Sequence, residues 1–166
     1  LIAFSASIGG LGTPVGTLKA LADGIELDIY LTKDGRIMVM HDADTRRCAG
    51  IDGKIADQTF EELRKLDVGR WKGEAFANSW IPLLEEVLAL LPSGKEALIE
   101  IKCGPEVVVP LWDCLQKLEI PLKQIQLHAF NFETICLMKK TAPSVRAHWL
   151  VGDTECDLER LVNQVV

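Results

Sequence analysis

The sequence lacks the marks of several large protein classes, and these absences narrow its function first. No apolar run approaches the roughly 20 residues that cross a bilayer, so we expect no transmembrane segment. The first ten residues have neither a basic region nor a long apolar stretch, which argues against a signal peptide. With 24 acidic and 18 basic residues the net charge is −6, and no basic stripe is present, so we expect no nucleic-acid partner.

Cysteine is present, but not in the patterns that carry disulfide or zinc chemistry. The five cysteines are odd in number, form no C-x-x-C and are widely spaced: Cys48, Cys103, Cys114, Cys136 and Cys156. This usage favours a reducing compartment and, with the missing signal, a cytoplasmic location. G-x-G-x-x-G, Walker and G-x-S-x-G motifs are also missing, which argues against dinucleotide binding, P-loop chemistry and α/β-hydrolase chemistry.

What the sequence does contain is an alternation of two residue periods, within a composition of 48% hydrophobic and 25% charged residues that fits one globular domain. Short apolar runs predict strands at 1–4, 24–30, 36–40, 97–101, 125–130 and 145–151. Capping signals predict helices from 59, over 82–91, 105–118 and 131–140, and from 153 or 154 to the C-terminus. The order predicts an α/β fold with a parallel sheet covered by helices, either doubly wound or a barrel.

The segment 42–81 departs from this alternation. It is rich in Arg, Asp and Gly and carries four aromatic residues, Phe60, Trp71, Phe76 and Trp80. We expect an insertion that forms a long loop with one helix and a small aromatic cluster of its own.

The first candidate for chemistry is a pair of carboxylates on the strand predicted at 24–30. Glu26 and Asp28 alternate along the strand with Tyr30 and therefore share one face. Neighbouring carboxylates repel unless a cation lies between them, and their oxygens suit Mg²⁺ or Ca²⁺ better than zinc. The alternative is an edge strand whose polar face is in water.

The next strand ends in a histidine. Lys33, Asp34 and Gly35 predict a tight turn into the strand 36–40, which delivers His41 followed by Asp42. A histidine can act as a general acid or base because its ordinary pKa lies near neutrality. A purely structural histidine is the alternative.

A second acidic strand places Glu100 and Lys102 on one face. Glu100 can complete a three-carboxylate metal site with Glu26 and Asp28, while Lys102 can neutralise an anionic substrate such as a phosphate. An internal ion pair between Glu100 and Lys102 is the alternative. His128 and His148 lie in apolar strands without neighbouring carboxylates in the sequence, so we expect packed or surface histidines rather than ligands.

The order of these motifs resembles the glycerophosphodiester phosphodiesterase family. The resemblance rests on A-D-G-I-E-L-D-I-Y-L-T-K-D-G, M-V-M-H-D, T-F-E-E-L-R-K-L-D-V-G, I-P-L-L-E-E-V-L and I-E-I-K, in that order. It is dense over residues 22–102 and looser towards the C-terminus. It implies a TIM (β/α)8-type barrel that uses a divalent cation, Mg²⁺ or Ca²⁺, to hydrolyse glycerophosphodiesters to glycerol 3-phosphate and an alcohol.

The resemblance also assigns roles to residues. Glu26, Asp28 and Glu100 match the metal ligands, His41 matches the second of two catalytic histidines, and Lys102 matches a lysine at the phosphate. The insertion 42–81, with Trp71 as a substrate-binding residue, matches a subdomain over the barrel mouth within a single domain 1–166. The oligomeric state and the substrate's headgroup are not implied.

Two departures accompany the match. The family's first strand ends in His-Arg-Gly and is followed by Pro-Glu-Asn-Thr, where this sequence has Phe4-Ser5-Ala6 and Pro14-Val15-Gly16-Thr17. The segment 17–26 is short for the usual first helix, and about three of the barrel's strands are missing. Either the chain is a divergent or truncated member, or it is part of an ordinary barrel enzyme, which we favour.

Two other functions remain open at this stage. One is a catalytically impaired member that keeps the site as a metal- and phosphate-binding module. The other is a related phospholipase of the sphingomyelinase D type, which the well-formed insertion with Trp71 argues against.

Overall fold

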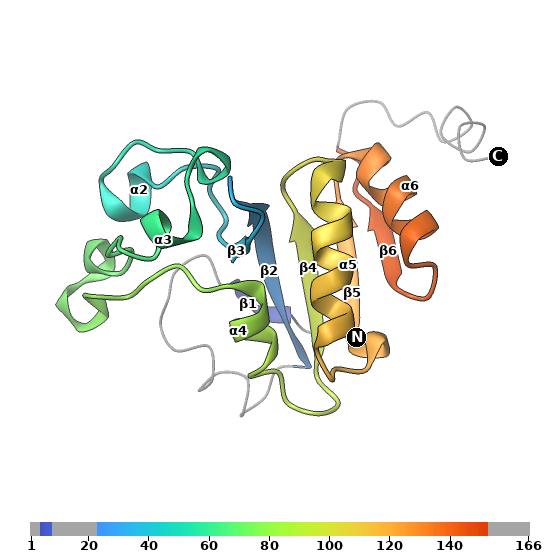
Figure 1. Ribbon diagram of the computed structural model, residues 1–166. Coiled ribbons are helices and arrows are strands. Elements are labelled where there is room, and N and C mark those ends of the chain that lie inside the picture. Colours follow the sequence, from blue (N-terminus) through green and yellow to red (C-terminus); the bar gives the residue numbers. More distant parts are fainter. Residues whose placement is uncertain (1–3, 8–22, 153–166) are drawn as a thin grey trace.

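The computed structural model describes residues 4–7 and 23–152. Its centre is a curved, mostly parallel sheet (Figure 1). Neighbouring strands follow the order β1-β2-β4-β5-β6, all parallel, and β3 adds to β2 in the antiparallel sense. The strands are β1 (Phe4–Ser7), β2 (Gly24–Leu31), β3 (Ile37–Val39), β4 (Glu96–Ile101), β5 (Ile125–Ala129) and β6 (Arg146–Trp149).

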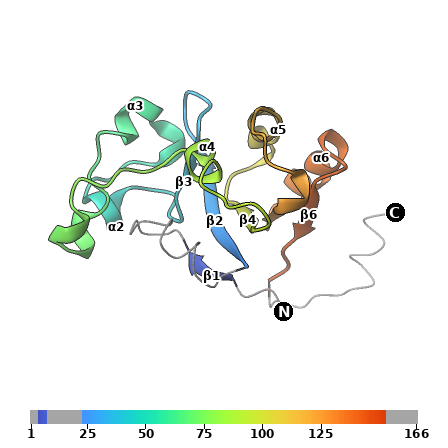
Figure 2. The same cartoon turned by 90° about the horizontal axis from the view of Figure 1, so that it is seen from below.

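The two faces of this sheet differ in chemistry because side chains alternate along each strand. One face buries apolar residues, among them Ile25, Leu27 and Ile99, which are all 0% exposed. The helices lie on this apolar side, as Figure 2 shows from below. The opposite face carries the ionisable residues of β2, β4 and β5, so the alternation separates the core from the candidate site.

The helices that cover the sheet begin where the sequence predicts, although one of them is shorter. The helix α4 (Leu84–Leu88) ends earlier than expected, α5 (Val108–Lys117) follows a 3-10 turn at Pro105–Val107, and α6 (Phe132–Thr141) begins after Asn131. The Asn131 side chain accepts a hydrogen bond from the Thr134 N–H at 2.9 Å, which caps α6 as its sequence predicts.

The tight turn at 33–35 also forms as predicted. Gly35 adopts φ 77°, a left-handed conformation that favours glycine. The Asp34 carboxylate accepts hydrogen bonds from the Thr32 hydroxyl at 2.6 Å and from the Phe60 N–H at 2.9 Å. The turn therefore fixes the start of β3 and also ties the beginning of a helix in the segment 42–81 to the sheet.

The segment 42–81 has more structure than a loop with one helix. It contains the short helices α2 (Arg46–Ala49) and α3 (Phe60–Leu63) and 3-10 turns at Ile55–Asp57, Arg70–Lys72 and Glu74–Phe76. The capping box of Thr59 and Glu62 at the start of α3 is present, as predicted.

The prediction of an aromatic cluster in this segment is wrong for three of its four rings, since only Phe60 packs against the small core. This core is aliphatic and sulfur-containing, and it includes the fully buried Ile55 and Leu63 and the β3 residue Met38. Trp71, Phe76 and Trp80 are instead 44%, 37% and 53% exposed. The aromatic rings flank charged side chains: the Arg64 guanidinium, for example, lies 5.5 Å from the Trp80 ring.

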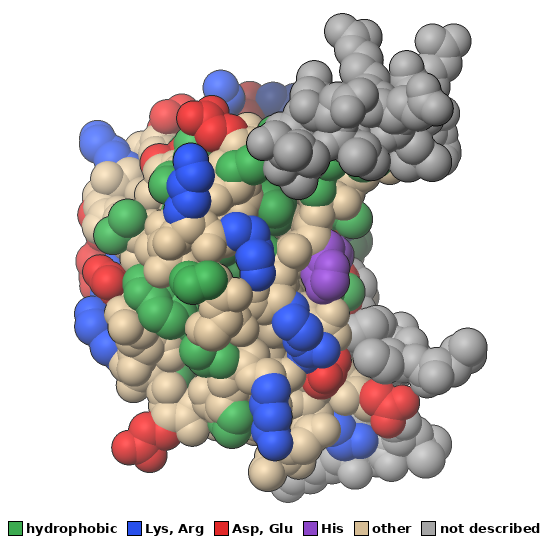
Figure 3. Space-filling model, turned by 90° about the vertical axis from the view of Figure 1, so that its right-hand side faces the viewer, with side chains coloured by type: hydrophobic (Ala, Val, Ile, Leu, Met, Phe, Trp, Pro, Cys, Tyr) green, Lys and Arg blue, Asp and Glu red, His purple; other side chains and the backbone are tan. Residues whose placement is uncertain are grey.

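The parallel order confirms the expected fold class, an incomplete TIM-type barrel, since the described strands form an open sheet. The expected strand at 1–4 is described only at its last residue, where β1 begins, and the expected helix from 153 or 154 lies outside the described residues. Within residues 4–7 and 23–152, no helix is long and apolar enough to span a membrane. On the side shown in Figure 3, basic, acidic and hydrophobic side chains are interspersed.

Candidate active site

Strand register gathers the ionisable residues of three strands into one row. Asp28 of β2 pairs with Glu100 of β4, and Glu100 pairs with His128 of β5. His148 of β6 continues the row as the partner of His128. Paired residues of neighbouring strands point to the same face of a sheet, so residues far apart in the sequence meet near the carboxyl ends of the strands.

Lys102 joins two of the carboxylates in this row. Its Nζ lies 2.5 Å from Glu100 Oε1 and 3.1 Å from Asp28 Oδ1, and the Asp28 side chain is only 3% exposed. The internal ion pair of Glu100 and Lys102 is therefore present, but it uses one oxygen of each carboxylate. Asp28 Oδ2 is buried and has no hydrogen-bond partner within the part of the chain that the structure describes.

A group of three side chains next to this pair can hold a metal ion. Ligand atoms of Glu26, Glu100 and His128 all lie within 4.8 Å of one another. His128 Nε2 is buried, lies 3.8 Å from Glu100 Oε2 and has no hydrogen-bond partner among the described residues. Buried polar atoms are rarely left unpaired, so these orphaned atoms fit a cation that is held by carboxylate and imidazole groups.

Burial and neighbouring charges shift the pKa values of the residues at this site. Burial raises the pKa of Glu26, and the charges of Asp28 and Glu100 raise it further, while Lys102 and His41 act in the opposite direction. Burial alone would lower the pKa of Lys102, but its hydrogen bonds to Glu100 and Asp28 outweigh burial and raise it. Burial lowers the pKa of His128. The site is thus a partly buried excess of negative charge, which a divalent cation would neutralise.

His41 is held at the end of the neighbouring strand. The Met40 N–H donates a 2.9 Å hydrogen bond to the Asp28 carbonyl, so His41 follows a residue that is fixed to β2. His41 Nδ1 lies 2.9 Å from Asp42 Oδ1, and Asp42 Oδ2 accepts a 2.5 Å hydrogen bond from Arg47 Nε. That bond with Arg47 is the main reason why the pKa of Asp42 is lowered. The His41 side chain is 54% exposed.

Trp71 is connected to this end of the site only indirectly. The Arg47 guanidinium lies 5.0 Å from the centre of the Trp71 ring, and Trp71 Nε1 donates to the Val68 carbonyl at 3.0 Å. The ring lines an open pocket of about 490 Å³ within the segment 42–81, together with Arg47 and Arg70. A substrate contact by Trp71 remains a prediction, as does the position of this segment over a barrel mouth.

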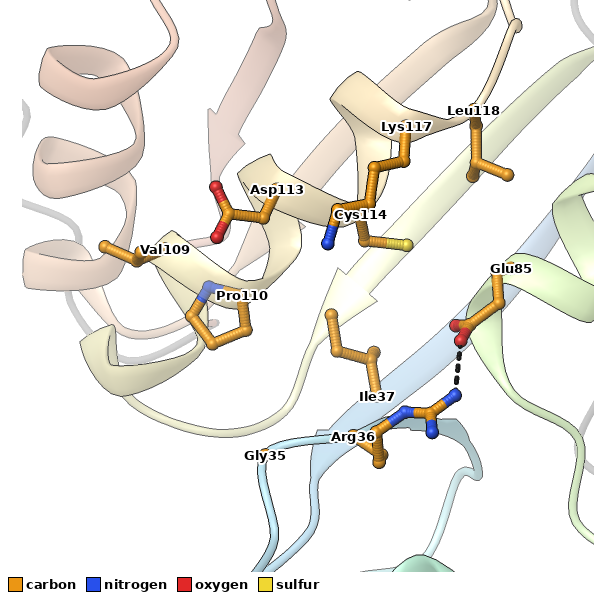
Figure 4. A pocket seen from close by; sticks show the side chains of 10 residues that line it. All are labelled: Gly35, Arg36, Ile37, Glu85, Val109, Pro110, Asp113, Cys114, Lys117 and Leu118. Atoms are coloured by element: carbon orange, nitrogen blue, oxygen red, sulfur yellow. Dashed lines mark hydrogen bonds and ion pairs between the residues drawn. The ribbon is translucent and has the colours of Figure 1, made fainter.

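The pocket at the strand ends lies elsewhere. It has a volume of about 280 Å³ and is lined by Glu100, Lys102 and residues that follow β4 and β5, including Gly104 and Asn131. A larger pocket of about 460 Å³ lies between α4, α5 and the start of β3 (Figure 4). It contains the ion pair of Arg36 and Glu85 but none of the predicted site residues, so we do not assign it to catalysis.

Sequence reasoning missed one residue of this site. His128 was expected to have no carboxylate neighbour, and this expectation is wrong because β5 pairs with β4 in a register that places it beside Glu100. The alternation of Gln126 and His128 against buried Ile125 and Leu127 was the available signal, since it puts both polar residues on the face opposite the core. His148 is exposed, as expected for a surface histidine.

Comparison with known proteins identifies the family of the chain. The model of the glycerophosphoryl diester phosphodiesterase family matches residues 17–158. The chain belongs to this family. A glycerophosphodiester phosphodiesterase of Caldanaerobacter subterraneus subsp. tengcongensis is 38% identical over 131 residues, covering 75% of this chain and 53% of the relative. One from Bacillus altitudinis is 32% identical over 142 residues, covering 82% and 58%.

Solved structures of family members share the fold. A glycerophosphodiester phosphodiesterase from Thermotoga maritima superposes with a TM-score of 0.69 at 26% identity, over 91% of this chain and 59% of the other. A phosphodiesterase from Oleispira antarctica, in complex with the product sn-glycerol-3-phosphate, has a TM-score of 0.77 at 22% identity, over 90% and 62%. The chain spans just over half the length of the first curated relatives that it matches. The family's dependence on a divalent cation fits the group of Glu26, Glu100 and His128.

Proposed function

We propose that this chain carries the metal-binding edge of a phosphodiesterase that hydrolyses glycerophosphodiesters to glycerol 3-phosphate and an alcohol. The observation that carries the proposal is the buried, negatively charged group at the ends of β2, β4 and β5, with unpaired atoms on Asp28 and His128. The family match and the glycerol 3-phosphate in the Oleispira antarctica relative support the substrate class.

Glu26, Asp28 and Glu100 would hold the cation, as the motif match implies. When bound, a divalent cation supplies Lewis-acid stabilisation of the negative charge that develops on the phosphate. Mg²⁺ and Ca²⁺ are the expected ions from the carboxylate ligands alone.

Lys102 and His41 would act on the substrate directly. Two donors of the Lys102 ammonium are directed to Asp28 and Glu100, and a third can bind a phosphate oxygen while the charge is held in place. His41 would give its proton to the alkoxide oxygen as the bond between phosphorus and that oxygen breaks. The Asp42 carboxylate would hold Nδ1 of the imidazole, which leaves Nε2 to face the substrate.

The runner-up is a binding module without turnover. The strand β1, Phe4–Ser7, contains no ionisable residue where the family has His-Arg-Gly, so one acid or base and one phosphate-binding arginine are absent from this stretch. Loss of one such group costs about 10²- to 10⁴-fold in rate. Binding of metal and glycerol 3-phosphate would survive that loss.

One assay separates these functions. Release of glycerol 3-phosphate from glycerophosphocholine and glycerophosphoethanolamine is measured with Mg²⁺, with Ca²⁺ and with a chelator, using the full chain of 18.3 kDa. We expect metal-dependent turnover that Glu100→Gln and His41→Ala abolish and that His148→Ala, an exposed histidine of the same row, leaves intact. A folded chain that binds metal and glycerol 3-phosphate without turnover would support the binding module instead.

A cytoplasmic location is part of the same proposal. Among the described residues Cys48, Cys103, Cys114 and Cys136 are free thiols, as a reducing compartment maintains. Burial raises the pKa of the Cys103 thiol to about 11, which favours the protonated thiol over the thiolate at neutral pH.

A further inference from the structure

His128 belongs to the candidate site although the residues on either side of it in the sequence are apolar. It lies in β5 between two apolar, fully buried neighbours, Leu127 and Ala129, yet its ring points to the polar face of the sheet. Its side chain is 13% exposed, and Nε2 is buried. The exposed fraction is small, so the ring nitrogen has little access to water.

Among residues 4–7 and 23–152, no side chain forms a hydrogen bond with this nitrogen. The nearest carboxylate oxygen, Glu100 Oε2, is 3.8 Å away, which is beyond hydrogen-bond distance. Glu100 is not free to move closer, because its other oxygen is held by Lys102 at 2.5 Å. The gap between His128 Nε2 and Glu100 Oε2 is wide enough for an ion that contacts both atoms.

A second atom nearby is unsatisfied in the same way. Asp28 is 2% exposed, and its Oδ1 faces Lys102, while Oδ2 has no hydrogen-bond partner in the described ranges 4–7 and 23–152. Lys102 therefore binds one oxygen of Asp28 and one oxygen of Glu100 and leaves the second oxygen of each carboxylate for another cation. Glu26 adds a carboxylate within 4.8 Å of both Glu100 and His128.

We propose that His128 Nε2 is a direct ligand of the divalent cation, beside Glu26 and Glu100, and that this nitrogen raises the affinity of the site for first-row transition metals, with Mn²⁺ as the probe, relative to Mg²⁺ and Ca²⁺. The inference rests on the metal site of the proposed function but goes beyond it, because the carboxylate motifs imply Mg²⁺ or Ca²⁺. Those two ions prefer oxygen donors, whereas imidazole suits first-row transition metals.

Metal titrations of the full chain test the preference without any need for turnover. Calorimetry gives the Kd of Mn²⁺, Mg²⁺ and Ca²⁺ for the unmodified chain, His128→Gln and Glu26→Gln. Glutamine places an oxygen close to the position of Nε2. We therefore expect His128→Gln to weaken Mn²⁺ binding at least tenfold and to change Mg²⁺ and Ca²⁺ binding by less than about threefold. His148→Gln, the register partner on β6, is the matched control and should change none of the three.

A spectroscopic signature identifies the ligand directly. Electron spin echo envelope modulation of bound Mn²⁺ should show the coupling of an imidazole ¹⁴N nucleus in the unmodified chain and in His148→Gln. The coupling should be absent in His128→Gln.

The outcomes also distinguish this inference from the proposed function. If Glu26→Gln abolishes metal binding while His128→Gln weakens all three metals equally, or if the nitrogen coupling is missing, the metal site stands and the role of His128 is overturned. If the folded chain binds none of the three ions, the metal site itself is wrong, and both proposals fail. If His128→Gln leaves every Kd unchanged, the imidazole is not a ligand.

Discussion

The charged groups at the strand ends are largely buried, whereas most of those of the segment 42–81 are exposed to solvent. At the strand ends, backbone register forces Asp28, Glu100 and His128 together in a largely buried row. In the segment, ion pairs such as Arg46 with Asp52 form between side chains that are both 68% exposed. Charges in the buried row have energetic consequences for one another, whereas solvent screens the exposed pairs. A functional site can therefore be expected where the fold buries several charged groups beside one another.

The largest contrast concerns the two apolar cores. Ile99 in the sheet core and Ile55 in the core of the segment are both 0% exposed, so Ile99→Ala and Ile55→Ala delete the same atoms. We expect Ile99→Ala to cost about 4 kcal/mol of global stability, as measured by urea unfolding. Ile55→Ala should instead speed amide exchange within 42–81 while the strands stay protected. Equal loss of protection everywhere would show that the two cores form one cooperative unit.

We expect Lys102 to contribute more to the unfolding free energy than any other lysine among the described residues. Lys102→Met leaves two carboxylates at the strand ends without their shared partner, which should cost about 3 kcal/mol of unfolding free energy. Lys117→Met, at an exposed position on α5, is the control and should have almost no effect. Mn²⁺ should restore part of the stability of Lys102→Met but not alter Lys117→Met. Similar unfolding curves for both variants would contradict the buried character of the site.

One ion pair of the segment should behave differently from the others. Asp42 and Asp52 each accept a 2.5 Å hydrogen bond from an arginine, but only Asp42 also contacts His41. We expect Asp42→Asn to lower turnover of glycerophosphocholine about tenfold, a part of what general-acid catalysis supplies, and Asp52→Asn to leave it unchanged. Nitrogen chemical shifts of His41 should show a changed tautomer only in Asp42→Asn. The same shifts in both variants would remove Asp42 from the site.

Glu26 should make the metal-free chain less stable as the pH rises. Its pKa in the folded chain is raised above the ordinary 4.5, mainly by burial and then by Asp28 and Glu100. The folded state therefore binds the proton more tightly, so the contribution is present below the ordinary pKa and is lost as the pH rises through the raised one. Glu26→Gln should melt slightly higher than the unmodified chain at neutral pH without metal. The difference should vanish near about pH 3. A lower melting temperature for Glu26→Gln at neutral pH would contradict this account.

The smallest effect is expected for the fully solvated pair. Arg46→Ala removes the contact with Asp52 and should change the unfolding free energy by less than about 0.5 kcal/mol, measured by urea unfolding at low and high salt. A loss above 1 kcal/mol would mean that exposed ion pairs stabilise the segment after all.

The sequence predicts the sheet better than the segment 42–81, because the alternation of apolar and polar residues along a strand can be read from adjacent positions in the sequence. Alternation along β2 and β4 correctly places Glu26 and Asp28, and Glu100 and Lys102, on shared faces. The cap at Asn131 and the turn at Gly35 are also local signals, and both are confirmed.

Contacts between distant residues could not be predicted from such signals. The core of 42–81 includes Met38 of β3 and buries Ile55 and Leu63. Of the four aromatic residues that suggested a cluster, three are exposed: Trp71, Phe76 and Trp80. The place of His128 beside Glu100 depends on which strand becomes the neighbour of β4, a property of the whole sheet. The bond of Asp42 to Arg47 depends similarly on the folding of α2.

The central claim is that the carboxyl ends of β2, β4 and β5 bind one divalent cation. The most direct test is a crystal structure of the full chain grown with Mn²⁺ and measured for anomalous scattering. We predict one strong anomalous peak about 2.0–2.6 Å from carboxylate oxygens of Glu26, Asp28 and Glu100 and from His128 Nε2. A well-ordered site without a peak there, or a peak held only by residues outside this group, would contradict the account.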